Sequence, residues 1–253
     1  MTKSDYKISQ NFLTSTRLLQ RIVNRSSINK EDTVLEIGTG KGHLTKVLAS
    51  RCNKVYSIEI DPHLFELAQA RLIGIKNIHL IHRDFLKFNL SSFSDYKIFA
   101  NIPFSKTTAI IHKITTSHHP PRDMWLIMEK GAAKRFMGER SENLRSLSLK
   151  PFWKLKIRYY FRRDDFHPKP KVDCVLVHFS LRRTPDLRID QLQSFQAFVR
   201  RGLQGGFQRN RKLLTQKQIS IALREAGLPP LRNSDSPTYD QWLCLFRCYL
   251  RFT

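Results

Sequence analysis

TVLEIGTGKG, residues 33–42, decides the fold. Its apolar run, 33–38, ends in glycine, and a helical stretch from His43 to Ser50 follows directly. A glycine-rich turn between a strand and a helix is where α/β proteins bring their backbone close to a nucleotide. Because glycines also serve ordinary tight turns, the weight of this motif depends on the segments around it.

Strand-like and helix-like runs alternate from Thr33 to Ser180. Two alternating runs, 155–161 and 175–181, flank the turn-rich HPKPK at 167–171, and we expect them to pair as terminal antiparallel strands. The alternation predicts an α/β, Rossmann-like fold, with a parallel sheet and helices on both faces. The other strands are expected at 54–60, 77–81, 97–102 and 124–129, and the helices at 62–72 and 107–116.

The character of the chain changes after Leu181. A charged, proline-bearing stretch at 182–188 reads as a linker, and three helical segments follow it. We therefore predict two domains, 1–181 and a small all-helical domain at 182–253. The helices are expected at Ile189–Gln204, Thr215–Ala226 and Thr238–Leu250, with breaks at Gly205-Gly206 and Gly227.

Two acids follow successive strands. Glu59 ends the strand after the glycine-rich turn, where an acid can bind both hydroxyls of a ribose. Asp84 follows the next strand and can accept from an adenine amino group, with Phe85 and Ile60 available to sandwich the ring. A single acid at such a position is more often a solvated helix cap or turn residue. A dehydrogenase would also have a glycine-rich turn and a ribose-binding acid, but its turn would read GxGxxG, whereas this one reads GTGKG. The joint spacing of these two acids resembles the S-adenosylmethionine (AdoMet) site of Rossmann-like methyltransferases.

Asn101-Ile102-Pro103-Phe104 ends the fourth predicted strand. It fits the (N/D)-(P/I/L)-P-(F/Y/W) tetrapeptide of amino-methyltransferases. The Asn101 amide oxygen and the Ile102 carbonyl can accept from an exocyclic amine and favour its nucleophilic form. Pro103 sets the turn, and Phe104 offers a face on which an extruded base can stack. The alternative is a strand-ending turn with Phe104 in the core.

Six segments together resemble the Erm family of rRNA adenine N6-methyltransferases, which cause resistance to macrolides, lincosamides and streptogramin B. They are SQNFL (9–13), EIGTGKGHLT (36–45), IEID (58–61), NIPF (101–104), MEKGAAKRF (128–136) and FHPKPKVD (166–173). The resemblance implies that the domain 1–181 binds AdoMet and catalyses the methyl transfer. It also implies that the domain 182–253 binds RNA. Phe104 stands where many members have Tyr, which excludes a phenolic role. The AdoMet contacts that the resemblance implies are Asn11, Leu13, Gly38, Glu59, Asp84 and Asn101. Gly40 of the glycine-rich turn, and Ile60 and Phe85 beside the two acids, complete the expected cofactor site.

The net charge is +23, and residues 130–171 hold 13 Lys/Arg against 4 Asp/Glu. A single basic run is usually a solvated face, but several runs around one cleft favour RNA phosphates. The resemblance implies 23S rRNA, methylated before ribosome assembly. The RNA-binding candidates are Lys130, Lys134, Arg135, Arg162, Arg163, Phe166, Arg209 and Arg211.

Other classes are less compatible with the sequence. It has no long apolar span, no signal-peptide h-region, and four scattered cysteines without metal-ligand spacing. We expect a cytoplasmic monomer without a metal. The alternatives are a small-subunit rRNA adenine dimethyltransferase in ribosome biogenesis and a non-catalytic RNA-binding factor with this fold. A DNA adenine methyltransferase would need a larger target-recognition domain.

Overall fold

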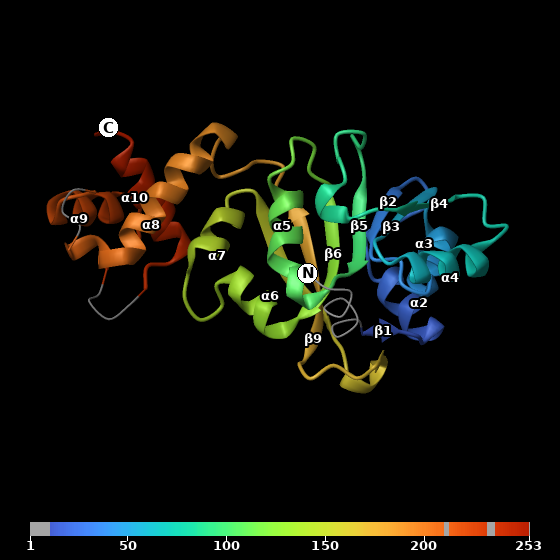
Figure 1. The fold of residues 1–253 in the computed structure, drawn as a ribbon. Helices are drawn as coiled ribbons and strands as arrows, with labels where there is room; N and C mark the ends of the chain where they lie inside the picture. Colours follow the sequence, from blue (N-terminus) through green and yellow to red (C-terminus); the bar gives the residue numbers. More distant parts are fainter. Residues whose placement is uncertain (1–10, 210–212, 232–235, 253) are drawn as a thin grey trace. The chain divides into compact units, whose positions relative to one another are not determined.

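The computed structural model describes residues 11–209, 213–231 and 236–252 (Figure 1). Its chain forms two compact units. The first holds the residues up to Ala133 together with Leu155–Leu181, and the second holds Lys134–Lys154 and the chain from Arg182 onward. The helical unit therefore includes 134–154, which the sequence analysis assigned to the first domain.

The strands are β1 (Phe12–Leu13), β2 (Thr33–Ile37), β3 (Lys54–Glu59), β4 (Ile78–His82), β5 (Lys97–Asn101), β6 (Asp123–Glu129), β7 (Trp153–Tyr160), β8 (Phe166–His167) and β9 (Cys174–Leu181). The helices are α2 (Thr16–Asn24), α3 (His43–Arg51), α4 (Pro62–Leu72), α5 (Thr107–Thr115), α6 (Lys130–Met137), α7 (Leu144–Leu149), α8 (Leu192–Arg209), α9 (Gln216–Glu225) and α10 (Tyr239–Tyr249). Short 3-10 turns include η1 (Phe85–Lys87), η2 (Phe104–Lys106) and η3 (Arg163–Asp165).

Within the described residues, seven strands form one sheet in the order β4-β3-β2-β5-β6-β9-β7. The first five of these are parallel, and β9 runs antiparallel to β6. The predicted Rossmann-like alternation is confirmed, with element ends shifted by one or two residues. Because the carboxyl ends of parallel strands meet at one edge, Ile37, Glu59 and Asn101 end close to one another.

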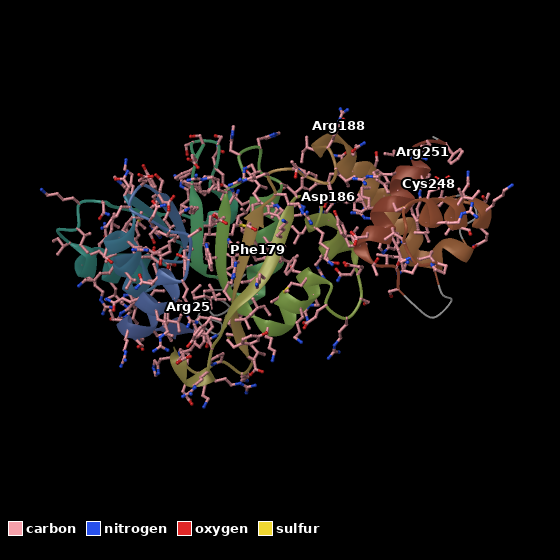
Figure 2. The ribbon with its side chains drawn as sticks, turned by 180° about the vertical axis from the view of Figure 1, so that it is seen from behind. Arg25, Phe179, Asp186, Arg188, Cys248 and Arg251 are labelled. Carbon is pink, nitrogen blue, oxygen red and sulfur yellow. The ribbon has the colours of Figure 1, made fainter. Side chains whose placement is uncertain are left out.

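Both faces of the sheet are covered. On β6, Trp125 and Ile127 point to one face and Met124, Leu126 and Met128 to the other, and all five are buried. Phe179 of β9 (Figure 2) is fully buried as well.

Helix α2 helps to cover the face of Trp125 and Ile127. This helix is not among those predicted from the sequence, although two signals mark it. Ser15 caps it by accepting from the N–H of Leu18, and its buried residues recur at helical spacing. These residues are Leu18, Leu19, Ile22 and Val23.

The helical unit has a core of its own, where Phe195 of α8 packs edge-on against Phe246 of α10. Leu147 of α7 belongs to that core, which explains why 134–154 associates with this unit. Asp186 (Figure 2) accepts a hydrogen bond from the hydroxyl of Tyr239 at 2.7 Å.

The three predicted C-terminal helices are present, and α9 and α10 begin at the capping boxes of Thr215 and Thr238. The predicted break at Gly205-Gly206 is wrong, since α8 continues through both glycines to Arg209. Glycine lowers helix stability without forbidding a helix. None of the described helices is long and apolar enough to cross a lipid bilayer.

Candidate active site at the carboxyl edge of the sheet

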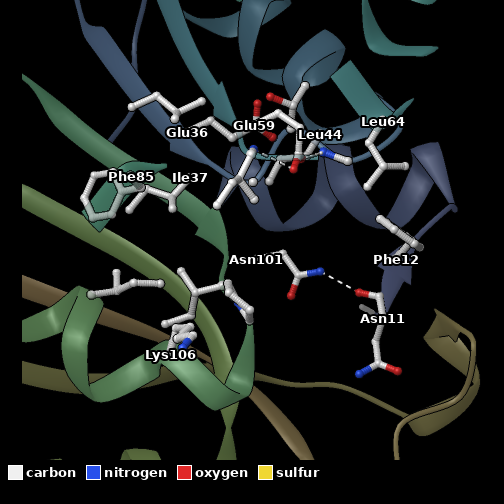
Figure 3. Close-up of a pocket in the computed structure, with 18 of the residues that line it drawn as sticks. Asn11, Phe12, Glu36, Ile37, Leu44, Glu59, Leu64, Phe85, Asn101 and Lys106 are labelled. Carbon is white, nitrogen blue, oxygen red and sulfur yellow. Dashed lines mark hydrogen bonds between the residues drawn. The ribbon is translucent and has the colours of Figure 1, made fainter. Parts of the chain in front are cut away.

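A cavity of about 470 Å³ opens at the edge where the parallel strands end (Figure 3). This volume lies within the usual range of ligand pockets, about 300–1,000 Å³. The cavity brings together every residue that the sequence analysis assigned to the cofactor and to the tetrapeptide. These are Asn11, Leu13, Gly38, Gly40, Glu59, Ile60, Asp84, Phe85, Asn101, Ile102, Pro103 and Phe104.

The glycine-rich turn has backbone conformations that favour glycine. Gly38 has φ +81°, and Gly40 has φ +55°. A Cβ atom added to Gly40 would lie 2.9 Å from Cε1 of Phe12, closer than real Cβ contacts. The turn therefore needs glycine at position 40 both for its φ and for the approach of the N-terminal segment.

Glu59 is held by the turn that it faces. Its Oε2 accepts from the N–H of Gly40 at 2.8 Å, and its Oε1 accepts from the N–H groups of Ile60 and Asp61 at 2.9 Å. Burial raises the pKa of this carboxyl, and the three backbone donors oppose that rise. The geometry presents a fixed acceptor toward the cavity.

Asp84, after β4, caps the turn η1, where its Oδ1 accepts from the N–H of Leu86 at 2.8 Å. Phe85 is 6% exposed and Ile60 is 37% exposed, and both line the cavity. The two apolar side chains and the carboxylate therefore lie where a planar, amine-bearing ring can contact all three.

Glu36 also lines the cavity, although it is not among the site residues predicted from the sequence. Its Oε2 accepts from the hydroxyls of Thr45 and Ser57, each at 2.6 Å. Its Oε1 is buried and has no hydrogen-bond partner among the described residues. Burial raises the pKa of this carboxyl to about 8. Its place near the end of β2, two residues before Gly38, was the available signal. A buried polar atom without a partner is a binding position for a ligand or water.

Asn101 ends β5 with its amide oriented by a residue 90 positions earlier. Its Nδ2 donates to the backbone carbonyl of Asn11 at 2.7 Å (Figure 3). That bond leaves Oδ1 as the acceptor end of the amide. The N-terminal segment is held in turn by β1, which pairs with β8.

The rest of the tetrapeptide turns away from the strand. The N–H of Ile102 donates to the carbonyl of Ile127 at 3.3 Å, and Pro103 adopts φ −64° at the start of η2. Phe104 is partly buried against the core. An aromatic face thus lies at the same cavity as Asn101.

The RNA-binding candidates differ in their exposure and in their ion pairs. Lys134 pairs with Glu139 at 3.0 Å, Arg163 pairs with Asp173 at 3.0 Å, and Arg135 and Arg162 are exposed. The prediction for Phe166 is wrong in this structure, because its ring is 4% exposed and packs against Phe161. A ring buried in this way has no free face for a base.

The remaining RNA-binding candidates are Lys130, Arg209 and Arg211. Lys130 lies over the ring of Tyr160, with its Nζ 5.7 Å from the ring centroid. Arg211 and the side chain of Arg209 lie outside the described residues. Among the residues that are described, no group of three or more His, Cys, Asp or Glu side chains forms a candidate metal site.

The fold and this cavity define a class: an AdoMet-dependent methyltransferase of the Rossmann-like type. The residues fit AdoMet through a cavity of suitable volume, an acid fixed against the glycine-rich turn, and a buried oxygen left open. Residues 1–243 match the model of the ribosomal RNA adenine dimethylase family, and the chain belongs to that family.

Similar proteins of known name are rRNA methyltransferases as well. An rRNA adenine N-6-methyltransferase of Escherichia coli is 37% identical over 97% of this chain and 96% of its own length. The ribosomal RNA small subunit methyltransferase A of Clostridium botulinum is 30% identical over 97% and 94%. The crystal structure of the 23S rRNA methyltransferase ErmE has a TM-score of 0.82 and 26% identity, covering 94% of this chain and 99% of that one. The protein is an rRNA (adenine-N6)-methyltransferase.

Proposed function

We propose that this enzyme methylates the N6 of one adenine in 23S rRNA and thereby confers resistance to macrolides, lincosamides and streptogramin B. The observation that carries the proposal is the similarity to ErmE, a 23S rRNA methyltransferase, which extends over nearly the whole of both chains. The proposed enzyme acts in the cytoplasm, as a monomer and without a metal, on rRNA that has not yet been assembled into ribosomes.

The second candidate is dimethylation of small-subunit rRNA in ribosome biogenesis. It has a specific observation in its favour, the 30% identity to a small subunit methyltransferase. The 37% identity to an rRNA adenine N-6-methyltransferase favours the first candidate. Both use the same site chemistry, so only the rRNA that receives the methyl group separates them.

In the proposed site, Glu59 binds the ribose of the cofactor, Asp84 accepts from its adenine amino group, and Phe85 and Ile60 contact the ring. Asn11, Leu13, Gly38 and Gly40 complete the cofactor contacts. AdoMet supplies a methyl group activated by a positively charged sulfur. The chain therefore needs to position the acceptor amine and exclude water.

Asn101 and Ile102 are proposed to hold that amine. The Oδ1 of Asn101 accepts one N–H of the target adenine, because Nδ2 is engaged by the Asn11 carbonyl. The carbonyl of Ile102 accepts the other N–H, in a turn fixed by Pro103. Phe104 stacks on the extruded base, and such a contact contributes about 1–3 kcal/mol. After the methyl transfer, the methylated amine loses its extra proton to water as the product leaves the cavity, since an amide is no base.

Primer extension on rRNA from cells with and without this gene tests the proposal. A new stop at one adenine of 23S rRNA, with resistance to the three drug classes, is the expected result. A stop confined to 16S rRNA would replace the proposal with the second candidate. Cells that carry the Asn101→Ala variant serve as the control, with equal protein levels checked by immunoblot. The purified enzyme should also methylate protein-free 23S rRNA faster than assembled subunits.

A further inference from the structure

The edge strand β7 and the second residue after it expose one row of side chains. Along β7, Lys156, Arg158 and Tyr160 are exposed, whereas the intervening Ile157 and Tyr159 are half-buried. Phe161 is buried and Arg162 is exposed, so the alternation continues past the strand. We call Lys156, Arg158, Tyr160 and Arg162 the β7 row. Its members point to one side, about 6.6 Å apart along the strand.

No acidic residue of the described segments pairs with the cations of this row. Within the described chain, Lys156, Arg158 and Arg162 form no ion pair, and the Nη2 of Arg158 lies 3.5 Å from Nδ1 of His178. Like charges at this spacing repel one another unless an anion lies between them.

The acids of the adjoining segment are already engaged. Asp164 pairs with Lys169 at 2.5 Å, and Asp173 pairs with Arg163 at 3.0 Å. Asp165 accepts from the backbone N–H of Arg162 at 2.8 Å. The chain therefore supplies cations along the row and uses its nearby acids elsewhere.

Tyr160 adds an aromatic surface to the row. Its side chain is 61% exposed, which is unusual for a ring of this size, and Lys130 lies 5.7 Å from its centroid. Edge strands often carry lysine to prevent pairing with another sheet, but an exposed tyrosine does not serve that purpose. An aromatic ring among cations is the combination that binds single-stranded nucleic acid.

The row begins at the same edge of the sheet as the cavity. The N–H of Phe161 donates to the carbonyl of Cys174, and Cys174 pairs with Glu129 at the carboxyl end of β6. Asn101 ends β5, which neighbours β6. Three steps across the sheet, from β5 through β6 and β9 to β7, amount to about 14 Å. That distance corresponds to a few nucleotides of extended RNA.

We propose that the β7 row binds the single-stranded RNA next to the methylated adenine. Lys156, Arg158 and Arg162 contact phosphates of this segment, and Tyr160, which lies between Arg158 and Arg162, stacks on one unpaired base. The inference rests on the proposed function for its substrate and adds the path by which that RNA leaves the cavity. In this proposal, three of the positive charges that make up the net charge of +23 bind RNA along the β7 row.

The test compares a Lys156→Ala/Arg158→Ala double variant with an Arg51→Ala/Lys76→Ala control. The control removes the same two residue types from exposed positions near the amino ends of the strands, away from the cavity. Fluorescence anisotropy measures binding to an rRNA hairpin that carries a single-stranded flank, over a range of KCl concentrations. Circular dichroism and AdoMet affinity verify that each variant is folded.

We expect the double variant to reduce the log–log salt slope by about 1.4, because each phosphate contact on a single strand contributes about 0.7. Tyr160→Ala should weaken binding about tenfold, and Tyr160→Phe should restore it, since the stacking face remains. On a hairpin without the flank, all these variants should bind like the wild type. The single-turnover rate at saturating RNA should not change.

Two results would overturn the inference: a double variant with the salt slope of the control, or a binding defect of equal size on the flankless hairpin. Charged residues that only protect the sheet edge would give the first. Failure of the proposed function is separate, because it appears as a wild-type enzyme that binds the hairpin but leaves 23S rRNA unmethylated.

Discussion

The side-chain amide of Asn101 carries two chemically different atoms at the cavity, and one hydrogen bond decides which of them is engaged by the protein. The Asn11 carbonyl can only accept, so it selects Nδ2 and leaves Oδ1 as the acceptor end of the amide. An acceptor is what an amine substrate needs. A backbone carbonyl is a constant feature of the chain, so this orientation does not depend on the side chain of residue 11.

Substitutions in the tetrapeptide should separate chemistry from cofactor binding. Asn101→Ala should greatly reduce turnover with a much smaller loss of AdoMet affinity, because it removes the acceptor for the amine. Phe104→Ala should cost about 1–3 kcal/mol in placing the base, and Phe104→Tyr should be almost silent because the stacking face remains. Single-turnover methylation of an rRNA hairpin at saturating AdoMet measures the rates. Wild-type rates in Asn101→Ala would remove the tetrapeptide from the site.

Glu36 should make stability depend on pH in the absence of cofactor. Burial raises its pKa from 4.5 to about 8, so between these values the folded protein holds a proton that the unfolded chain has released. Its contribution is fully present below pH 4.5 and is lost as the pH rises through about 8, on the order of 1.4 kcal/mol per pH unit.

Glu36→Gln keeps the shape of the side chain and removes the titration. The wild type should therefore lose stability relative to Glu36→Gln as the pH rises from 6 to 8. Urea unfolding of both proteins at pH 6, 7 and 8 gives the two free energies of unfolding. Taking their difference removes the contributions of groups common to both, including Glu59. A difference independent of pH would show that Glu36 is ionised in the folded protein.

At the scale of elements, the short strands β1 and β8 fasten the N-terminal segment beside the cavity. Leu13 pairs with Phe166, and Phe12 pairs with His167. Phe12 also lies against Gly40, and Lys41 is 5.7 Å from its ring centroid. Two residues of strand thus connect the glycine-rich turn, the Asn11 carbonyl and the segment after β7. The burial of Phe166 follows from this pairing.

Gly40→Ala should disturb this contact, and Gly74→Ala is its matched control. Both glycines have left-handed backbone conformations, φ +55° and +83°, so each alanine introduces strain of about 1–3 kcal/mol. Only the alanine at position 40 would contact another side chain, that of Phe12, because no atom lies within 4 Å of a Cβ at position 74. Calorimetry should show AdoMet binding at least tenfold weaker in Gly40→Ala alone. Equal affinities in the two variants would mean that Phe12 moves aside at no cost to the site.

For the whole molecule, the net charge of +23 is the dominant electrostatic property. Binding to a 23S rRNA fragment should fall steeply with salt, with a log–log slope of several units, at about 0.7 for each neutralised phosphate on a single strand. Filter binding between 50 and 300 mM KCl measures this slope. Over these concentrations the Debye screening length falls from about 14 to about 5 Å. AdoMet affinity over the same range is the control and should change little. RNA affinity that does not change with salt concentration would show that the positive charge does not contribute to RNA binding.

Local patterns in the sequence were sufficient for much of this protein. The alternation of apolar runs predicted the parallel strands, and the glycine-rich turn, Glu59, Asp84 and NIPF were predicted to meet at one cavity. These predictions succeed because periodicity and turn chemistry act over a few residues, and because parallel strands bring their carboxyl ends to one edge. The predicted helix break at Gly205-Gly206 failed because glycine propensity is only a weak local preference.

The sequence by itself determined the order of the elements and the residue types that surround the cavity. Only the tertiary structure decided that Asn11 orients Asn101, that Phe166 is buried, that Glu36 keeps an unpartnered oxygen, and that β7 becomes an exposed edge. Each of these depends on residues far apart in the chain. Burial and pairing are properties of the packed chain, because the water removed from a side chain depends on every element that covers it.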